Sequence, residues 1–229
     1  QFDSKFWMCK SLINMNYFNQ IEKEKLNPIY IYIYRDGRDV DLSFKKAIIG
    51  PKHSYFTAKK WLNDQTICEK IKTNVSRSRF ISVKYEDLIL HPKKTLFYIC
   101  EKIKVKYNDK VLDYYKSNES KVSASAGEMW SNLSKPILIN NSSKFIKNLN
   151  KEELQIFESI AIKPLKNLGY NLINNDDDLI SRFSDLDIER FTNANSEIKL
   201  HTYTNANKKD LIQMEPYENF KKNLVSKVF

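Results

Sequence analysis

A continuous apolar run from Ile29 to Tyr34 is the clearest pattern in this chain, because all six of its residues are β-branched or aromatic. Such a run predicts a central parallel strand that is buried on both faces. Downstream of an Arg-Asp-Gly-Arg-Asp sequence, apolar positions recur at helical spacing, and Gly50-Pro51 ends that pattern. We therefore expect a buried strand that leads directly into an amphipathic helix.

Strand and helix patterns alternate along the rest of the first 173 residues. The chain predicts a helix over 53–72, a strand over 79–85, a loop over 86–91, a helix over 92–103, a short helix capped by Asn108, and a helix from Asn150 to Gly169 with a capping box at its start. This alternation is typical of an α/β fold with a parallel β-sheet flanked by helices. We assign residues 1–173 to this domain. The polar residues 174–229 are interpreted as a C-terminal extension of unknown role, either packed on the domain or partly mobile.

Composition limits the classes of protein and of ligand that fit this chain. The 229 residues carry 41% hydrophobic residues, which suffices for one globular core, and a formal net charge of +10. This charge suits an anionic ligand, although lysines spread along the whole chain also indicate a generally basic surface. The three cysteines have no CxxC spacing, so neither a zinc site nor a disulfide framework is indicated.

Targeting information is scarce. No run reaches the length of a membrane-spanning segment. The chain begins with Gln1, and we expect it to be truncated at its N-terminus. A cytoplasmic location is favoured, with the Golgi lumen as the alternative if an anchor precedes Gln1.

The junction between the Ile29–Tyr34 strand and the following helix is suited to holding an anion. Ligands of α/β proteins bind where strands end, and a helix N-terminus there favours negative charge. Arg35 can offer a planar donor fork to a phosphate, and Ser43, two turns into the helix, can add a hydroxyl. The remaining residues would fix the turn by capping, ion pairing and backbone freedom, namely Asp36, Gly37, Arg38 and Asp39. The alternative is that Arg35 and Asp39 form only a surface ion pair.

The stretch from Arg35 to Ser43 resembles the second nucleotide motif of the sulfotransferases that use 3′-phosphoadenylyl sulfate (PAPS), Arg-Asp-x-Arg-Asp-Val-x-x-Ser. That resemblance implies that Arg35 and Ser43 bind the 3′-phosphate. Residues 84–88 with Pro92 are similar to the Tyr-Glu-Asp-Leu segment of the same family, which implies that Tyr85 lies near the adenine. The resemblance to this family also implies a PAPS co-substrate and a reaction that needs no metal.

Four further candidate residues come from looser similarity to the same family. Residues 130–147 and the helix that ends at Gly169-Tyr170 resemble its C-terminal segment, which implies that Ser143 and Lys144 belong to a basic loop at the 3′-phosphate. Lys10, before Ser11, is at a position that implies contact with the bridging oxygen of the donor, although a surface lysine is an equal alternative. His53 is the candidate catalytic base, with a capping or substrate-contacting role as the alternative.

One feature of the family is absent from the sequence. Its glycine-rich phosphosulfate loop has no counterpart, because the four glycines lie at positions 37, 50, 127 and 169. We expect this loop either to precede Gln1 or to have been lost. The sequence thus predicts a PAPS-dependent sulfotransferase with an unidentified hydroxyl or amine acceptor. The alternatives are a non-catalytic nucleotide- or polyanion-binding domain and generic nucleic-acid binding, while no specific nucleic acid is expected as a partner.

Overall fold

The described part of the chain contains one parallel pair of strands. The computed structural model describes residues 6–11 and 13–225. Strands β1 (Tyr30–Tyr34) and β2 (Phe80–Lys84) form a two-stranded parallel sheet in which Tyr32 lies opposite Ser82. The predicted α/β class with a parallel sheet is confirmed.

Helices connect and follow the two strands. Between them lie α2 (Gly37–Lys46) and α3 (Ser54–Asn74), and β2 leads into α4 (Tyr85–Leu90) and α5 (Pro92–Lys102). The prediction of a loop over 86–91 was wrong, because α4 is helical. Glu86 and Asp87 in its first turn favour a helix N-terminus, and Pro92 restricts the preceding residue, so the helix stops before His91.

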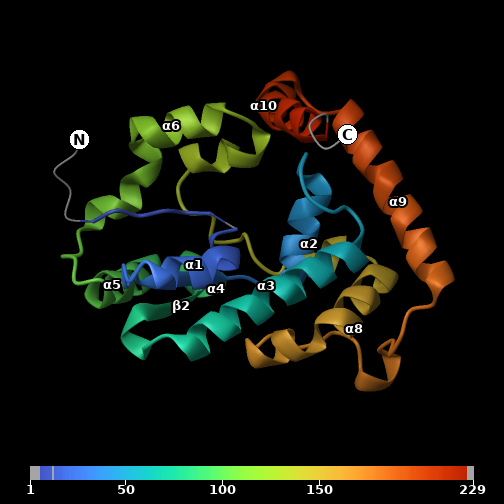
Figure 1. Ribbon diagram of the computed structural model, residues 1–229, viewed down its shortest axis with the longest axis horizontal. Coiled ribbons are helices and arrows are strands. Elements are labelled where there is room, and N and C mark those ends of the chain that lie inside the picture. Colours follow the sequence, from blue (N-terminus) through green and yellow to red (C-terminus); the bar gives the residue numbers. More distant parts are fainter. Residues whose placement is uncertain (1–5, 12, 226–229) are drawn as a thin grey trace.

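The remaining elements extend the molecule away from the sheet. Figure 1 shows α6 apart from the strands and α9 running along one side of the molecule. In chain order these elements are η1 (Asn14–Tyr17), α1 (Phe18–Lys23), η2 (Arg77–Arg79), η3 (Asp109–Lys116), α6 (Asn118–Ser125), η4 (Glu128–Ser134), α7 (Phe145–Asn148), α8 (Lys151–Asn167), η5 (Asp176–Asp178), α9 (Asp185–Thr204) and α10 (Lys208–Val225). The predicted caps at Asn108 and Asn150 are confirmed, the latter with its complete capping box. No helix within the described ranges combines the length and apolar character that crossing a membrane requires.

The two faces of β1 are unequally covered. The tyrosine face packs toward α3, where the Tyr32 hydroxyl donates to Gln65. On the other face Ile31 and Ile33 are 38% and 54% exposed. The prediction of burial on both faces was therefore wrong. The reason is that β1 has one neighbouring strand in the described part of the chain, and the described elements leave its isoleucine face open.

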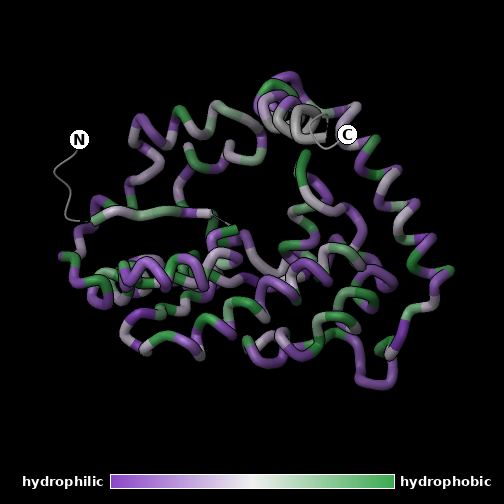
Figure 2. The backbone as a smooth tube through the Cα atoms, in the orientation of Figure 1, coloured by the Kyte–Doolittle hydropathy of each residue, from purple (hydrophilic) through white to green (hydrophobic). Residues whose placement is uncertain are grey.

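The main core lies between α3 and α8, and the start of α2 packs against it. Trp61 of α3 and Phe157 of α8 lie with ring centroids 6.0 Å apart. A Cβ atom at Gly37 would stand 2.6 Å from the Phe157 ring. The predicted role of Gly37 in backbone freedom is thus corrected, because the close approach of two aromatic rings requires a residue without a side chain. Figure 2 shows how apolar positions gather along α8, whereas α9 mixes apolar and polar positions.

The described part of residues 174–229 packs onto the rest of the chain. Phe191 of α9 is buried in a cluster with Tyr55 and Ile156. The Asn195 side chain accepts a hydrogen bond from the Lys52 backbone N–H at 2.8 Å. At the start of α10, Asp210 accepts one from the Glu128 N–H at 2.9 Å. These contacts favour the packed alternative, while the division at residue 173 stays a prediction.

Candidate functional site

The turn between β1 and α2 is held by a buried arginine. The Asp36 carboxylate caps α2 by accepting from the Arg38 N–H at 3.0 Å, and it also accepts from Nε at 3.0 Å and Nη2 at 2.7 Å of the same arginine. Arg38 is only 2% exposed. These bonds confirm that Asp36 and Arg38 fix the turn by capping and ion pairing.

A second carboxylate, Glu158 of α8, completes this buried network. Arg38 Nη1 donates to Glu158 and to the Asn171 carbonyl, the latter at 2.9 Å. Glu158 is fully buried and also accepts the backbone N–H groups of Ile173 and Asn174, each at 2.9 Å. The network therefore joins the start of α2 to α8 and to the turn that follows it. Sequence reasoning missed Glu158, because one acidic residue inside an amphipathic helix gives no signal of burial.

Asp39 connects the same turn to a distant loop. Its side chain is fully buried. Oδ2 accepts from the Ser143 N–H at 2.7 Å and Oδ1 from the Phe145 N–H at 3.0 Å. Ser143 adopts a left-handed backbone conformation, with φ of 56°. The nearest guanidinium atom of Arg35 lies 3.8 Å from Oδ2. The carboxylate thus faces both the predicted arginine and the predicted basic loop.

Arg35 lies between Tyr85 and the loop. Its Nη2 donates to the Asn141 carbonyl at 2.7 Å, and its guanidinium carbon lies 4.7 Å from the centre of the Tyr85 ring. The Asn141 side chain donates to the Tyr85 hydroxyl at 2.7 Å. Arg35 Nε is buried and has no hydrogen-bond partner among the described residues. Apart from Nη2, the donors of this guanidinium thus have no hydrogen-bond partner among the described residues.

Ser43 completes the arrangement on the same face of α2. Its hydroxyl donates to the Asp39 carbonyl at 3.0 Å, one helical turn earlier, and the side chain is exposed. We name the set formed by Arg35, Asp39, Ser43, Tyr85, Asn141 and Ser143 the Asp39 cluster. It reaches solvent at Ser43, Ser143 and the adjacent Lys144. The structure thus brings together Arg35, Ser43, Tyr85 and the loop of Ser143 and Lys144, and adds Asn141, for which the sequence offered no signal.

Residues 1–109 match the family model described as "Sulfotransferase family". This part of the chain belongs to the sulfotransferase family. The matched residues include Arg35, Asp39, Ser43 and Tyr85, whereas Asn141 and Ser143 follow the match. No curated protein matches the chain. The match to residues 1–109 supports a transferase and suggests sulfuryl transfer in general.

Two predicted residues lie outside the Asp39 cluster. His53 is the N-cap of α3: its Nδ1 accepts from the Tyr55 N–H at 3.2 Å, and its ring stacks on Phe191 at 4.5 Å. Burial lowers the pKa of His53. The capping alternative is therefore observed, and a role as base stays a prediction. Lys10 is exposed in the extended segment 6–11 and makes no hydrogen bond or ion pair with another described residue.

Glu86 ties the Tyr-Glu-Asp-Leu segment to the same turn. One carboxylate oxygen accepts from the Asp36 N–H at 3.1 Å, and the other accepts from the Tyr170 hydroxyl at 2.9 Å. Burial, followed by the negative charge of Glu86, raises the pKa of Tyr170. The hydroxyl therefore stays protonated and donates. Glu86 thus links the residue before Gly37 to the end of α8, which the sequence similarity alone did not indicate.

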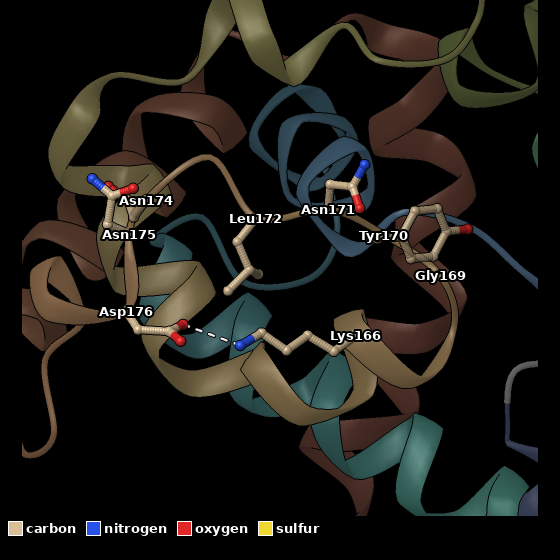
Figure 3. A pocket seen from close by; sticks show the side chains of 8 residues that line it. All are labelled: Lys166, Gly169, Tyr170, Asn171, Leu172, Asn174, Asn175 and Asp176. Carbon is tan, nitrogen blue, oxygen red and sulfur yellow. Dashed lines mark hydrogen bonds and ion pairs between the residues drawn. The ribbon is translucent and has the colours of Figure 1, made fainter.

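Two pockets of the described structure lie away from the Asp39 cluster. One of about 480 Å³ is formed by the C-terminal end of α8 and the segment that follows it. There Lys166 pairs with Asp176, and Tyr170 forms one side (Figure 3). The other, of about 600 Å³, is lined by Lys93, Lys94, Phe97, Tyr107 and Asp109. None of the catalytic or nucleotide-binding residues predicted from the sequence lines either pocket. Among residues 6–11 and 13–225 there is no group of three acidic, histidine or cysteine side chains suited to a metal ion.

Proposed function

We propose that this protein is a sulfotransferase whose donor is PAPS and that the Asp39 cluster binds the 3′-phosphate of that nucleotide. The observation that supports this most strongly is the state of Arg35. Within the described part of the chain, its guanidinium makes one hydrogen bond, at Nη2, and its buried Nε has no partner. A guanidinium has five N–H donors, and phosphate oxygens match its planar fork.

The residues around Arg35 supply what a nucleotide phosphate needs. Ser43 offers a hydroxyl on the same helix face, and Lys144 adds a positive charge from the loop. The Tyr85 ring packs on the guanidinium, which limits its rotamers and presents an aromatic surface for a base. Together these groups can hold both a phosphate and the adjoining nucleoside. PAPS therefore fits the residues present better than a generic polyanion, which would need no aromatic neighbour.

Transfer forms a bond between the acceptor oxygen or nitrogen and sulfur, and breaks the bond between sulfur and the oxygen of the nucleotide phosphate. The acceptor proton passes to a base, and the products are a sulfated acceptor and adenosine 3′,5′-bisphosphate. Lys10, exposed in the segment 6–11, is proposed to stabilise the departing phosphate oxygen. His53 is the proposed base, in competition with its observed capping role.

Binding of adenosine 3′,5′-bisphosphate tests the nucleotide site, with adenosine 5′-monophosphate as the ligand that lacks only the 3′-phosphate. Calorimetry should show tighter binding of the bisphosphate to the wild type. Arg35→Ala should weaken that binding by about 10- to 150-fold, corresponding to roughly 1.5–3 kcal/mol for a hydrogen bond to a charged group. Its binding of the monophosphate should be unchanged.

Arg79→Ala is the matched control, because Arg79 is an arginine at the opposite end of the sheet whose guanidinium is occupied by Glu22 and the Pro28 carbonyl. It removes the same charge and should leave the preference for the bisphosphate intact. A wild type without that preference would refute the proposed site. Labelled PAPS offered with panels of hydroxyl and amine acceptors then tests catalysis. Nucleotide binding without any transfer would support the non-catalytic alternative instead.

A further inference from the structure

We infer that Asp39 is a positioning residue that couples docking of the loop 141–145 to the readiness of Arg35 for an anion. This inference rests on the proposed function, because it concerns the same arginine. Two kinds of partner are within reach of the Asp39 carboxylate: the backbone N–H groups of the loop and the guanidinium of Arg35. When the loop is docked, its N–H groups satisfy the carboxylate, and Arg35 stays available for the nucleotide.

The contacts show which of these partners forms hydrogen bonds with Asp39. Each carboxylate oxygen accepts one loop N–H, from Ser143 at 2.7 Å and from Phe145 at 3.0 Å. The guanidinium of Arg35 stays at 3.8 Å, which is longer than the 2.7–2.9 Å typical of a charge-assisted hydrogen bond. Asp39 therefore accepts hydrogen bonds from the loop and none from Arg35, although the two opposite charges are neighbours.

Because Asp39 is buried, the loss of its hydrogen bonds to the loop would carry a large energetic cost. A fully buried carboxylate that lost both loop N–H groups would be left without compensation, and such a charge is strongly destabilising. Arg35 is its nearest cation, and a short shift of the side chain would turn their contact into a hydrogen-bonded pair. An undocked loop thus draws the guanidinium onto Asp39. A phosphate would then have to compete with a carboxylate for the same donors.

The loop carries further groups into the site when it docks. The Asn141 carbonyl accepts from Arg35, and the Asn141 side chain donates to the hydroxyl of Tyr85. Ser143 and Lys144 come to the solvent-facing side of the same cluster. Docking therefore assembles the site around Arg35 in one step. By linkage, a ligand that binds the docked state must also stabilise docking.

The substitution Asp39→Asn distinguishes this coupling from simple electrostatics, because the two predict opposite changes in the affinity for adenosine 3′,5′-bisphosphate. If Asp39 acted only as a nearby negative charge, its neutralisation would tighten binding of adenosine 3′,5′-bisphosphate. Coupling predicts about tenfold weaker binding, because one loop N–H loses its acceptor, and a lost hydrogen bond of roughly 1.4 kcal/mol corresponds to that factor. Binding of adenosine 5′-monophosphate should change less than twofold.

Glu158→Gln is the matched control for that variant. Glu158 is also a fully buried carboxylate that accepts two backbone N–H groups from a later turn, those of Ile173 and Asn174. It makes no contact with the loop 141–145 among its hydrogen bonds. Loss of the negative charge of Glu158 should lower the free energy of unfolding without changing the preference for the 3′-phosphate.

Hydrogen exchange of the wild type supplies a measurement that does not depend on how a variant folds. The amides of Ser143 and Phe145 should exchange several-fold more slowly with adenosine 3′,5′-bisphosphate bound than with the monophosphate. In Asp39→Asn the same amides should exchange about tenfold faster without ligand, by the same energetic conversion. A wild type that does not prefer the bisphosphate would refute the proposed function. A wild type with that preference, but with tighter binding by Asp39→Asn or unchanged exchange on binding, would refute the coupling alone.

Discussion

Removal of the Glu158 carboxylate should be the most damaging single change near the site. Glu158 is fully buried and accepts from Arg38, which is itself 2% exposed, and from the backbone N–H groups of Ile173 and Asn174. The substitution Glu158→Ala leaves Arg38 with Asp36 and one carbonyl as partners, and it leaves two backbone donors without an acceptor. The Arg38 guanidinium cannot respond by losing its proton.

The magnitude follows from the burial of the pair. Loss of one partner from a buried ion pair costs about 3–5 kcal/mol, whereas most domains are stable by only about 5–15 kcal/mol. The variant should therefore lose a large part of its stability, or fail to fold at elevated temperature. Lys166→Ala is the comparison, because the Lys166–Asp176 pair is 51% and 75% exposed and such pairs contribute about 0–1 kcal/mol.

Urea unfolding followed by far-ultraviolet circular dichroism measures both variants against the wild type. We expect a lower midpoint for Glu158→Ala with an unchanged slope, since the surface exposed on unfolding stays similar. Lys166→Ala should unfold within experimental error of the wild type. If Glu158→Ala lost less than about 1 kcal/mol, the burial-based reasoning would be wrong, because the cost would match that of an exposed pair.

Two further predictions concern Lys52 and His53. Lys52 is fully buried and donates to the carbonyls of Phe44, Ala47 and Ile49, and burial lowers its pKa from 10.5 to about 8. Between these two pH values the folded chain therefore binds fewer protons than the unfolded chain. The free energy of unfolding of the wild type, relative to that of Lys52→Met, should rise with pH in this range. If the urea midpoints of the two proteins changed equally between pH 7.5 and 9.5, this prediction would be wrong. His53→Asn preserves a capping side chain for α3 but removes the proposed base, so sulfate transfer should fall by about 100-fold or more, whereas a loss of only a few-fold would leave His53 with its capping role alone.

Local patterns predicted most of the elements near the site. The apolar run before Arg35 became β1, the helical spacing beyond it became α2, and the Asn150 capping box begins α8. Each of these features depends on neighbours within a few residues along the chain. The short helix α4 escaped prediction because six residues span too little of a helical period to stand out from a polar loop.

The sequence by itself determined the alternation of β1, α2, α3, β2, α5 and α8, the arginine motif at the end of β1 and, through residues 1–109, the match to the sulfotransferase family. The tertiary structure alone decided that Asp39 accepts from a loop 104 residues further on, that Glu158 completes the Arg38 network, and that one face of β1 stays open. Periodicity records which face of a segment is apolar. It does not record which distant segment satisfies a buried charge, because that partner is set by the path of the whole chain.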